Sequence, residues 1–192
     1  MSNGISERDE SDSIIGQHYF APTGCERATR IEIQNGNTQL EISAGPWGIA
    51  TTEDREILVY IFALLRGRMR VSAKTSRTVS FEAADLFRAM GTQNDANAQS
   101  NLEASLVRLQ STTLSIHFSN GDFGLDACFG WIDSLELKAK TDGQGREILG
   151  KITVNLNEWI FDLLRPGHPS LLEGSAQLPP SLISSIRYGA DV

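Results

Sequence analysis

A short run of cationic side chains is the part of this sequence best suited to chemistry. Its five members fall within residues 66–77, and no Asp or Glu lies between them: Arg66, Arg68, Arg70, Lys74 and Arg77. Guanidinium and ammonium groups pair with phosphate oxygens, which positions a protein on DNA without reading its sequence. A solvated loop is the other interpretation of such a run, and the residues themselves leave both open.

The overall charge of the chain does not favour nucleic acid. The 192 residues carry a formal net charge of −7, whereas phosphate neutralisation needs Lys and Arg. The distribution is uneven, however: residues 1–50 hold three basic and seven acidic side chains, but residues 51–80 hold six basic and three acidic. The cationic run is therefore a local positive stripe on an acidic protein.

Other chemistry finds little support in the residue pattern. His18, His117 and His168 lack the spacing of metal ligands, and no nucleophile with a neighbouring base is recognisable. We therefore expect no metal, no other cofactor and no enzymatic activity. Cys25 and Cys128 form no metal-spaced cluster, which favours reduced thiols in a cytoplasmic protein. The acidic N-terminus does not resemble a signal peptide, and no apolar run reaches the length of a membrane span.

The three tryptophans offer a second way of contacting nucleic acid, because indole rings can stack on the bases of a single strand. Trp47, Trp131 and Trp159 all fall within apolar patterns of the sequence, however. We therefore expect them to pack in the core.

Hydrophobic periodicity predicts the elements that must position these residues. Alternating runs around Asn35-Gly36 indicate a hairpin, and a helix follows from Thr51 or Thr52 and ends or frays at Gly67. A short strand and a helix that ends at Gly91 come next. The spacing then changes from helix to strand within residues 100–118, with Leu102, Leu106 and Leu109 forming the core face of the third helix.

The remaining strands complete the predicted fold. Alternating segments near residues 113–118, 127–140 and 146–156 indicate an antiparallel wing of three strands, with a bulge near Asp133, and Asn157 begins a last helix. We predict an α+β fold: a winged helix with an N-terminal β-hairpin and a three-stranded antiparallel wing. We expect a disordered acidic leader over 1–17, the winged-helix domain over 18–164, and over 165–192 a loop-rich tail that could be the truncated start of a second winged-helix domain.

Five stretches carry a resemblance to a known family: "GIATTEDREILVYIFALL", "SRTVSFEAADLFRAMG", "LEASLVRLQSTTLSIHF", "GWIDSLEL" and "ITVNLNEWIFDLL". In order and spacing, from about Ile31 to Leu164, the chain resembles the plasmid replication initiator protein A family. The resemblance implies winged-helix domains that bind repeated sites of a plasmid origin, promote strand opening and help to load the host replication machinery. It also implies homodimers, which in such families often repress their own gene.

Two departures from the family pattern affect this expectation. The third helix holds Glu103, Val107 and Gln110 at positions that are commonly more basic in the family. The family also continues into a further basic, helix-rich segment, so we expect this chain to correspond to the N-terminal portion.

The third helix is the candidate DNA reader of such a fold. Its predicted outer face is small and neutral, and two residues that could reach DNA, Asn101 and Arg108, lie at its flank. Ala104 and Val107 on that face favour packing or dimerisation over base reading. Two functions therefore stay open: an origin-binding module of a plasmid initiator, or a regulatory module that pairs with full-length initiator without binding DNA.

Overall fold

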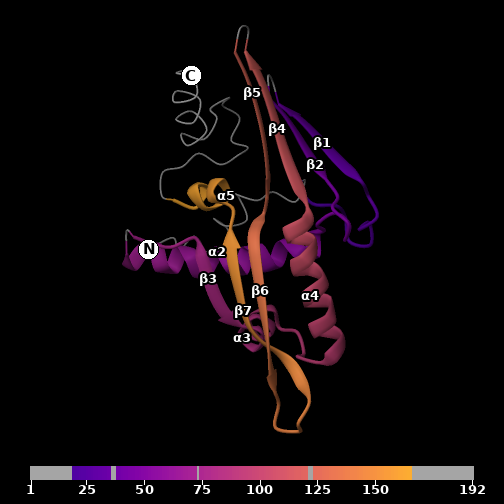
Figure 1. Cartoon of the computed structure of the whole chain (residues 1–192), viewed down its shortest axis with the longest axis vertical. Helices are drawn as coiled ribbons and strands as arrows, with labels where there is room; N and C mark the ends of the chain where they lie inside the picture. Colours follow the sequence, from indigo (N-terminus) through magenta and orange to yellow (C-terminus); the bar gives the residue numbers. More distant parts are fainter. Residues whose placement is uncertain (1–18, 36–37, 73, 121–122, 166–192) are drawn as a thin grey trace, which may run out of the picture.

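The computed structural model describes residues 19–35, 38–72, 74–120 and 123–165 (Figure 1). They form two antiparallel sheets, with helices packed against the smaller one. This mixed α and β composition agrees with the predicted class. The expected leader (1–17) and nearly all of the expected tail (165–192) lie outside the described residues.

The larger sheet has the strand order β1-β2-β4-β5. β1 (Arg30–Asn35) and β2 (Thr38–Ser43) form the predicted N-terminal hairpin, although its turn lies outside the described residues. β4 (Thr113–Asn120) pairs with β2, and β5 (Phe123–Gly130) pairs with β4. The sheet projects away from the helices (Figure 1). Alternation places four buried side chains on one of its faces: Leu40, Ile42, Leu114 and Ile116.

The smaller sheet has the order β3-β7-β6. Its strands are β3 (Thr78–Glu82), β7 (Glu147–Leu156) and β6 (Ile132–Thr141). The register of β6 against β7 shifts between Ile132 and Ser134, which confirms the predicted bulge.

The prediction that three strands within 113–156 form one wing is wrong. Its first strand, β4, belongs to the larger sheet, and the chain crosses from one sheet to the other at Trp131, between β5 and β6. The Trp131 side chain is fully buried and stacks on Phe20 with ring centroids 5.0 Å apart. Periodicity predicts that strands exist, but their partners depend on contacts between distant segments.

Local capping signals predict the helix boundaries well. Thr51 is the N-cap of α2 (Thr52–Val71), Gly91 with φ of 67° is the C-cap of α3 (Ala83–Met90), and Asn157 is the N-cap of α5 (Glu158–Leu163). Gly67 does not end α2, which continues for one further turn. α4 (Ala96–Ser111) is the predicted third helix.

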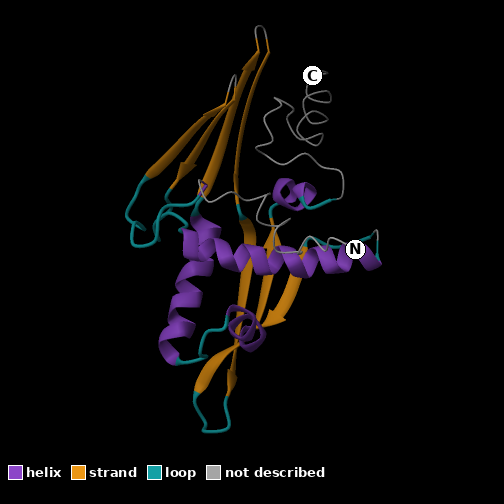
Figure 2. Cartoon of the chain, turned by 180° about the vertical axis from the view of Figure 1, so that it is seen from behind, coloured by secondary structure: helices purple, strands orange, loops and turns teal. Residues whose placement is uncertain are grey.

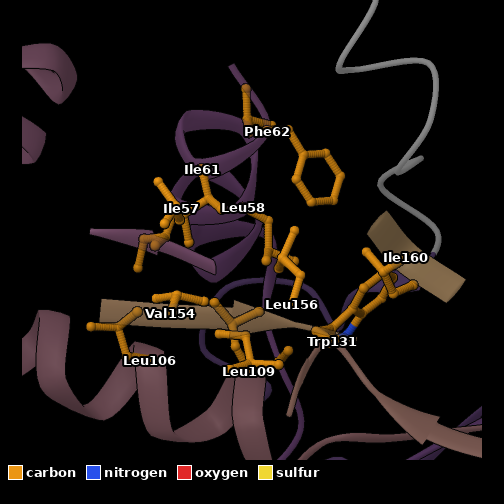
Figure 3. Close-up of a cluster of buried hydrophobic side chains, with 14 of the residues drawn as sticks. Ile57, Leu58, Ile61, Phe62, Leu106, Leu109, Trp131, Val154, Leu156 and Ile160 are labelled. Carbon is orange, nitrogen blue, oxygen red and sulfur yellow. The ribbon is translucent and has the colours of Figure 1, made fainter. Parts of the chain in front are cut away.

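The core lies where α2 and α4 meet the smaller sheet. Figure 2 shows α2 crossing the strands of this sheet. In the close-up, Ile57, Leu58, Ile61 and Phe62 of α2 gather with side chains of β7 and α4, and with Trp131 and Ile160 (Figure 3). The predicted core face of α4 (Leu102, Leu106 and Leu109) is buried, which confirms that periodicity.

A tight turn before α2 packs against the last residue of α4. The Gly48 amide donates to the Gly45 carbonyl at 3.1 Å, and a Cβ atom on Gly45 would lie 2.4 Å from the Ser111 carbonyl oxygen. Trp47 lies in this turn and is 67% exposed. The prediction that Trp47 packs in the core is therefore wrong, whereas Trp131 is buried and Trp159 is partly buried, as predicted.

Substitution of Gly45 tests this close packing. Gly45→Ala should lower the free energy of unfolding by about 1–3 kcal/mol, because the new methyl group overpacks the turn against backbone. Gly143→Ala is the matched control, since a Cβ there meets no atom within 4 Å. Urea denaturation measures both, and equal stability of the two variants would contradict the packing.

Candidate nucleic-acid interface

Most of the cationic stripe lies on one projecting end of the molecule. Arg66, Arg68 and Arg70 belong to the last turns of α2, which extend past the smaller sheet (Figure 2). Arg68 and Arg70 are exposed, and Lys74 is exposed in the loop that follows. Arg68 Nη1 donates to the Thr78 carbonyl at 3.2 Å, which ties the helix end to β3 and leaves the side chain on the surface.

Arg77 has a different environment from the other four cations. Its Nη1 donates to the Leu156 carbonyl at 2.7 Å and forms an ion pair with the carboxylate of Asp133. Asn157 Nδ2 donates to the same carboxylate at 2.9 Å. Arg77 therefore links the starts of β3 and β6 to the end of β7, and its guanidinium is engaged within the protein, contrary to the predicted phosphate contact.

Arg108 points into the interior of the protein. Its position in the sequence predicts instead a place at the flank of α4, within reach of DNA. Its guanidinium donates to Asp54 in a bidentate pair, Nε to Oδ2 at 2.8 Å and Nη2 to Oδ1 at 2.7 Å. The Asp54 side chain is fully buried and that of Arg108 is 16% exposed. The hydrogen bond with Asp54 raises the pKa of Arg108 above its ordinary value, although burial opposes this. Its guanidinium is thus engaged in the interior, contrary to the predicted contact with DNA.

Asp54 also caps α2, because its Oδ2 accepts the Thr51 amide at 2.9 Å. The sequence predicts the helix start at Thr51 or Thr52, but it does not reveal this ion pair of Asp54. No local signal could have shown it, since the partner lies 54 positions away.

The outer face of α4 is neutral, as predicted. Ser100 and Ala104 are exposed and Val107 is partly buried. Asn101 is exposed and lines a groove of about 510 Å³ between α2, α3 and α4, which sequence reasoning also missed. The structure thus keeps the arginines at the end of α2 apart from the uncharged face of α4.

Within residues 19–165, apart from the gaps given above, no three His, Cys, Asp or Glu side chains gather to hold a metal ion. None of the described helices combines the length and the apolar character of a membrane span.

This fold has counterparts among solved structures. It is similar to two crystal structures of domains 2 and 3 of RctB, each 14% identical in sequence. The first has a TM-score of 0.61 over 84% of this chain and 63% of that chain, and the second 0.59 over 79% and 58%. The chain thus spans about three fifths of each.

The family model named replication initiator protein A matches residues 10–172. The chain therefore belongs to the replication initiator protein A family, which confirms the resemblance seen in its sequence. No curated protein matches the chain.

Substitution of Arg108 tests its structural role. Arg108→Ala should lower the free energy of unfolding by about 3–5 kcal/mol, because it leaves a buried carboxylate without its cation. The exposed Arg68→Ala should cost less than about 1 kcal/mol. Urea denaturation followed by tryptophan fluorescence compares them, and similar losses would refute the interior role of Arg108.

Proposed function

We propose that this chain is a DNA-binding module of a plasmid replication initiator, and that the end of α2 contacts the phosphate backbone of origin DNA. One observation carries the proposal: Arg66, Arg68, Arg70 and Lys74 lie together on a projecting end of a chain whose net charge is −7. Each such cation that meets a phosphate releases counterions, which favours binding without sequence preference.

The arrangement of elements supports a winged helix over much of the proposed domain (18–164). Three helices (α2, α3 and α4) pack with a sheet in which β3 joins the β6–β7 hairpin, in the order β3-β7-β6. In such a fold the second helix of the helix-turn-helix, here α4, lies in the major groove of the bound DNA. The exposed groups of α4 that can read base edges are few, chiefly the amides of Asn97 and Asn101, which also line the groove, so phosphate contacts supply most of the affinity.

Membership of the family supports the wider part of the proposal. The module acts in the cytoplasm at repeated sites of the plasmid origin, together with the host replication machinery, and it works by binding and not as an enzyme. No cofactor takes part.

A second candidate function is pairing with another copy or with full-length initiator, without DNA. The neutral outer face of α4 favours it, because that face continues into the turn of Trp47, where Gly45 packs against Ser111. An exposed indole beside a neutral surface is typical of the residues that anchor protein interfaces. A homodimer formed through Ala104, Val107 and Trp47 would meet little charge repulsion.

Neutralising the stripe tests the first proposal. The triple variant Arg66→Ala, Arg68→Ala and Arg70→Ala should weaken binding to any duplex alike. It should also flatten the slope of log K against log salt by about 0.9 for each phosphate that is no longer neutralised. Fluorescence anisotropy at several salt concentrations measures both effects.

The matched control removes the same charge from three separate surfaces, with Arg27→Ala, Arg88→Ala and Arg165→Ala. An equal loss of affinity in the control would show that net charge and not the stripe determines binding. Unchanged affinity in the first variant would make the stripe a solvated surface.

Placing a charge on the outer face of α4 tests the second candidate. Val107→Glu should raise the dissociation constant of the homodimer while the monomer stays folded, because an unpaired charge at an interface is costly. Trp47→Ala should act in the same direction. Sedimentation at matched concentrations measures the change, with the exposed Gln144→Glu as the charge-matched control. A wild type that remains monomeric would remove this face from the interface.

A further inference from the structure

The groove between α2, α3 and α4 has an apolar floor. The side chains of Ile57, Phe87, Met90 and Leu102 contribute to its lining. Three of them are almost completely buried, but Met90 is 42% exposed at the end of α3. It is one of only three large apolar side chains that are exposed in the described part of the chain. The groove thus offers a ready contact for an apolar side chain.

Carboxylates line the same groove. Glu53 and Glu56 come from the first turns of α2, and Asp95 comes from the start of α4. Arg55 pairs with Glu56 at 3.2 Å and offsets one of these three charges, so the lining keeps a negative balance. The occupant that fits is therefore an apolar side chain surrounded by cations.

The other end of α2 has that composition. Val71 is the last residue of the helix and is 89% exposed. Arg68, Arg70 and Lys74 flank it, and no acidic residue lies within 66–77. Two exposed apolar residues of this chain, Val71 and Met90, thus lie in surroundings of opposite charge.

These two surfaces cannot meet within one copy. The groove lies at the start of α2 and Val71 at its end, and a helix of 20 residues keeps its ends about 30 Å apart. We propose that the end of α2 of one copy docks in the acidic groove of a second copy, with Val71 against Met90. The acidic rim and the cationic helix end supply the charge complementarity that selects this partner.

The contact joins unlike surfaces, so each new pair keeps one open groove and one open helix end. Such heterologous contacts extend into rings or open chains of copies, whereas a contact between two α4 faces closes at a dimer. The end of α2 also carries the arginines of the proposed DNA contact, so DNA and a second copy compete for it.

The test uses the full chain in the Val107→Glu background and without DNA, so that neither the α4 face nor phosphate binding affects the result. Val71→Asp places an acid against the carboxylates, and Met90→Lys places a cation against the arginines. Both positions are exposed, and a cation at the end of α3 is compatible with the helix dipole. Gln144→Asp is the control for added charge.

Sedimentation velocity at low salt should show the parent and the control growing beyond a dimer as concentration rises. Each single variant should stay monomeric, with the dissociation constant raised about tenfold or more. An equimolar mixture of the two variants should associate again, because the intact groove of the Val71→Asp variant accepts the intact helix end of the Met90→Lys variant. This complementation would also show that both variants fold.

A parent that stays monomeric or stops at a dimer would overturn the proposal, and so would a mixture that stays monomeric. Loss of DNA binding in the arginine variants tests the DNA proposal separately, since this assay contains no DNA.

Discussion

The buried ion pair between Asp54 and Arg108 fixes the relation of α2 to α4, on which the rest of the structure depends. Both hydrogen bonds of the pair are shorter than 3 Å, and the planar guanidinium sets the orientation as well as the distance. A second tie lies close by, where the Ala50 amide donates to Thr112 Oγ1 at 2.8 Å. Together they join the segment that enters α2 to the segment that leaves α4, where the two sheets begin to diverge.

This junction explains how one chain supports two unlike surfaces. The start of α2 is held against α4, so the last turns of the helix extend past the smaller sheet (Figure 2). Arg68 and Arg70 there are exposed, whereas Arg77 and Arg108 form ion pairs, with Asp133 and Asp54, that join separate secondary-structure elements. The outer face of α4 remains neutral because Arg108, the cation of that helix, is paired with Asp54. The acidic groove lies at the opposite end of α2 from the cations.

Sequence patterns predict the local features of this protein and miss the distant ones. Thr51, Gly91 and Asn157 mark helix ends correctly, because a cap involves neighbouring residues only. The partners of β4 and the roles of Arg77 and Arg108 depend on residues far away in the chain. The prediction for Trp47 is wrong because it relies on the apolar character of the side chain. The neighbouring glycines and proline are turn signals, and they indicate a surface loop. Of the candidate site, the stripe could be predicted, but the groove is formed by three helices and has no signature in the sequence.

The pairing of β2 with β4 has a consequence for how the protein folds. Residues 44–112, which include α2, β3, α3 and α4, lie between these strands in the chain. Closing so long a loop costs conformational entropy that local contacts must first offset, so long-range strand pairing is slow. The β1–β2 hairpin is synthesised early, but β2 gains its second neighbouring strand only when β4 pairs with it. Completion of the larger sheet therefore follows the folding of the helices. Protection of the β2 and β4 amides from hydrogen exchange would report when the helices are in place.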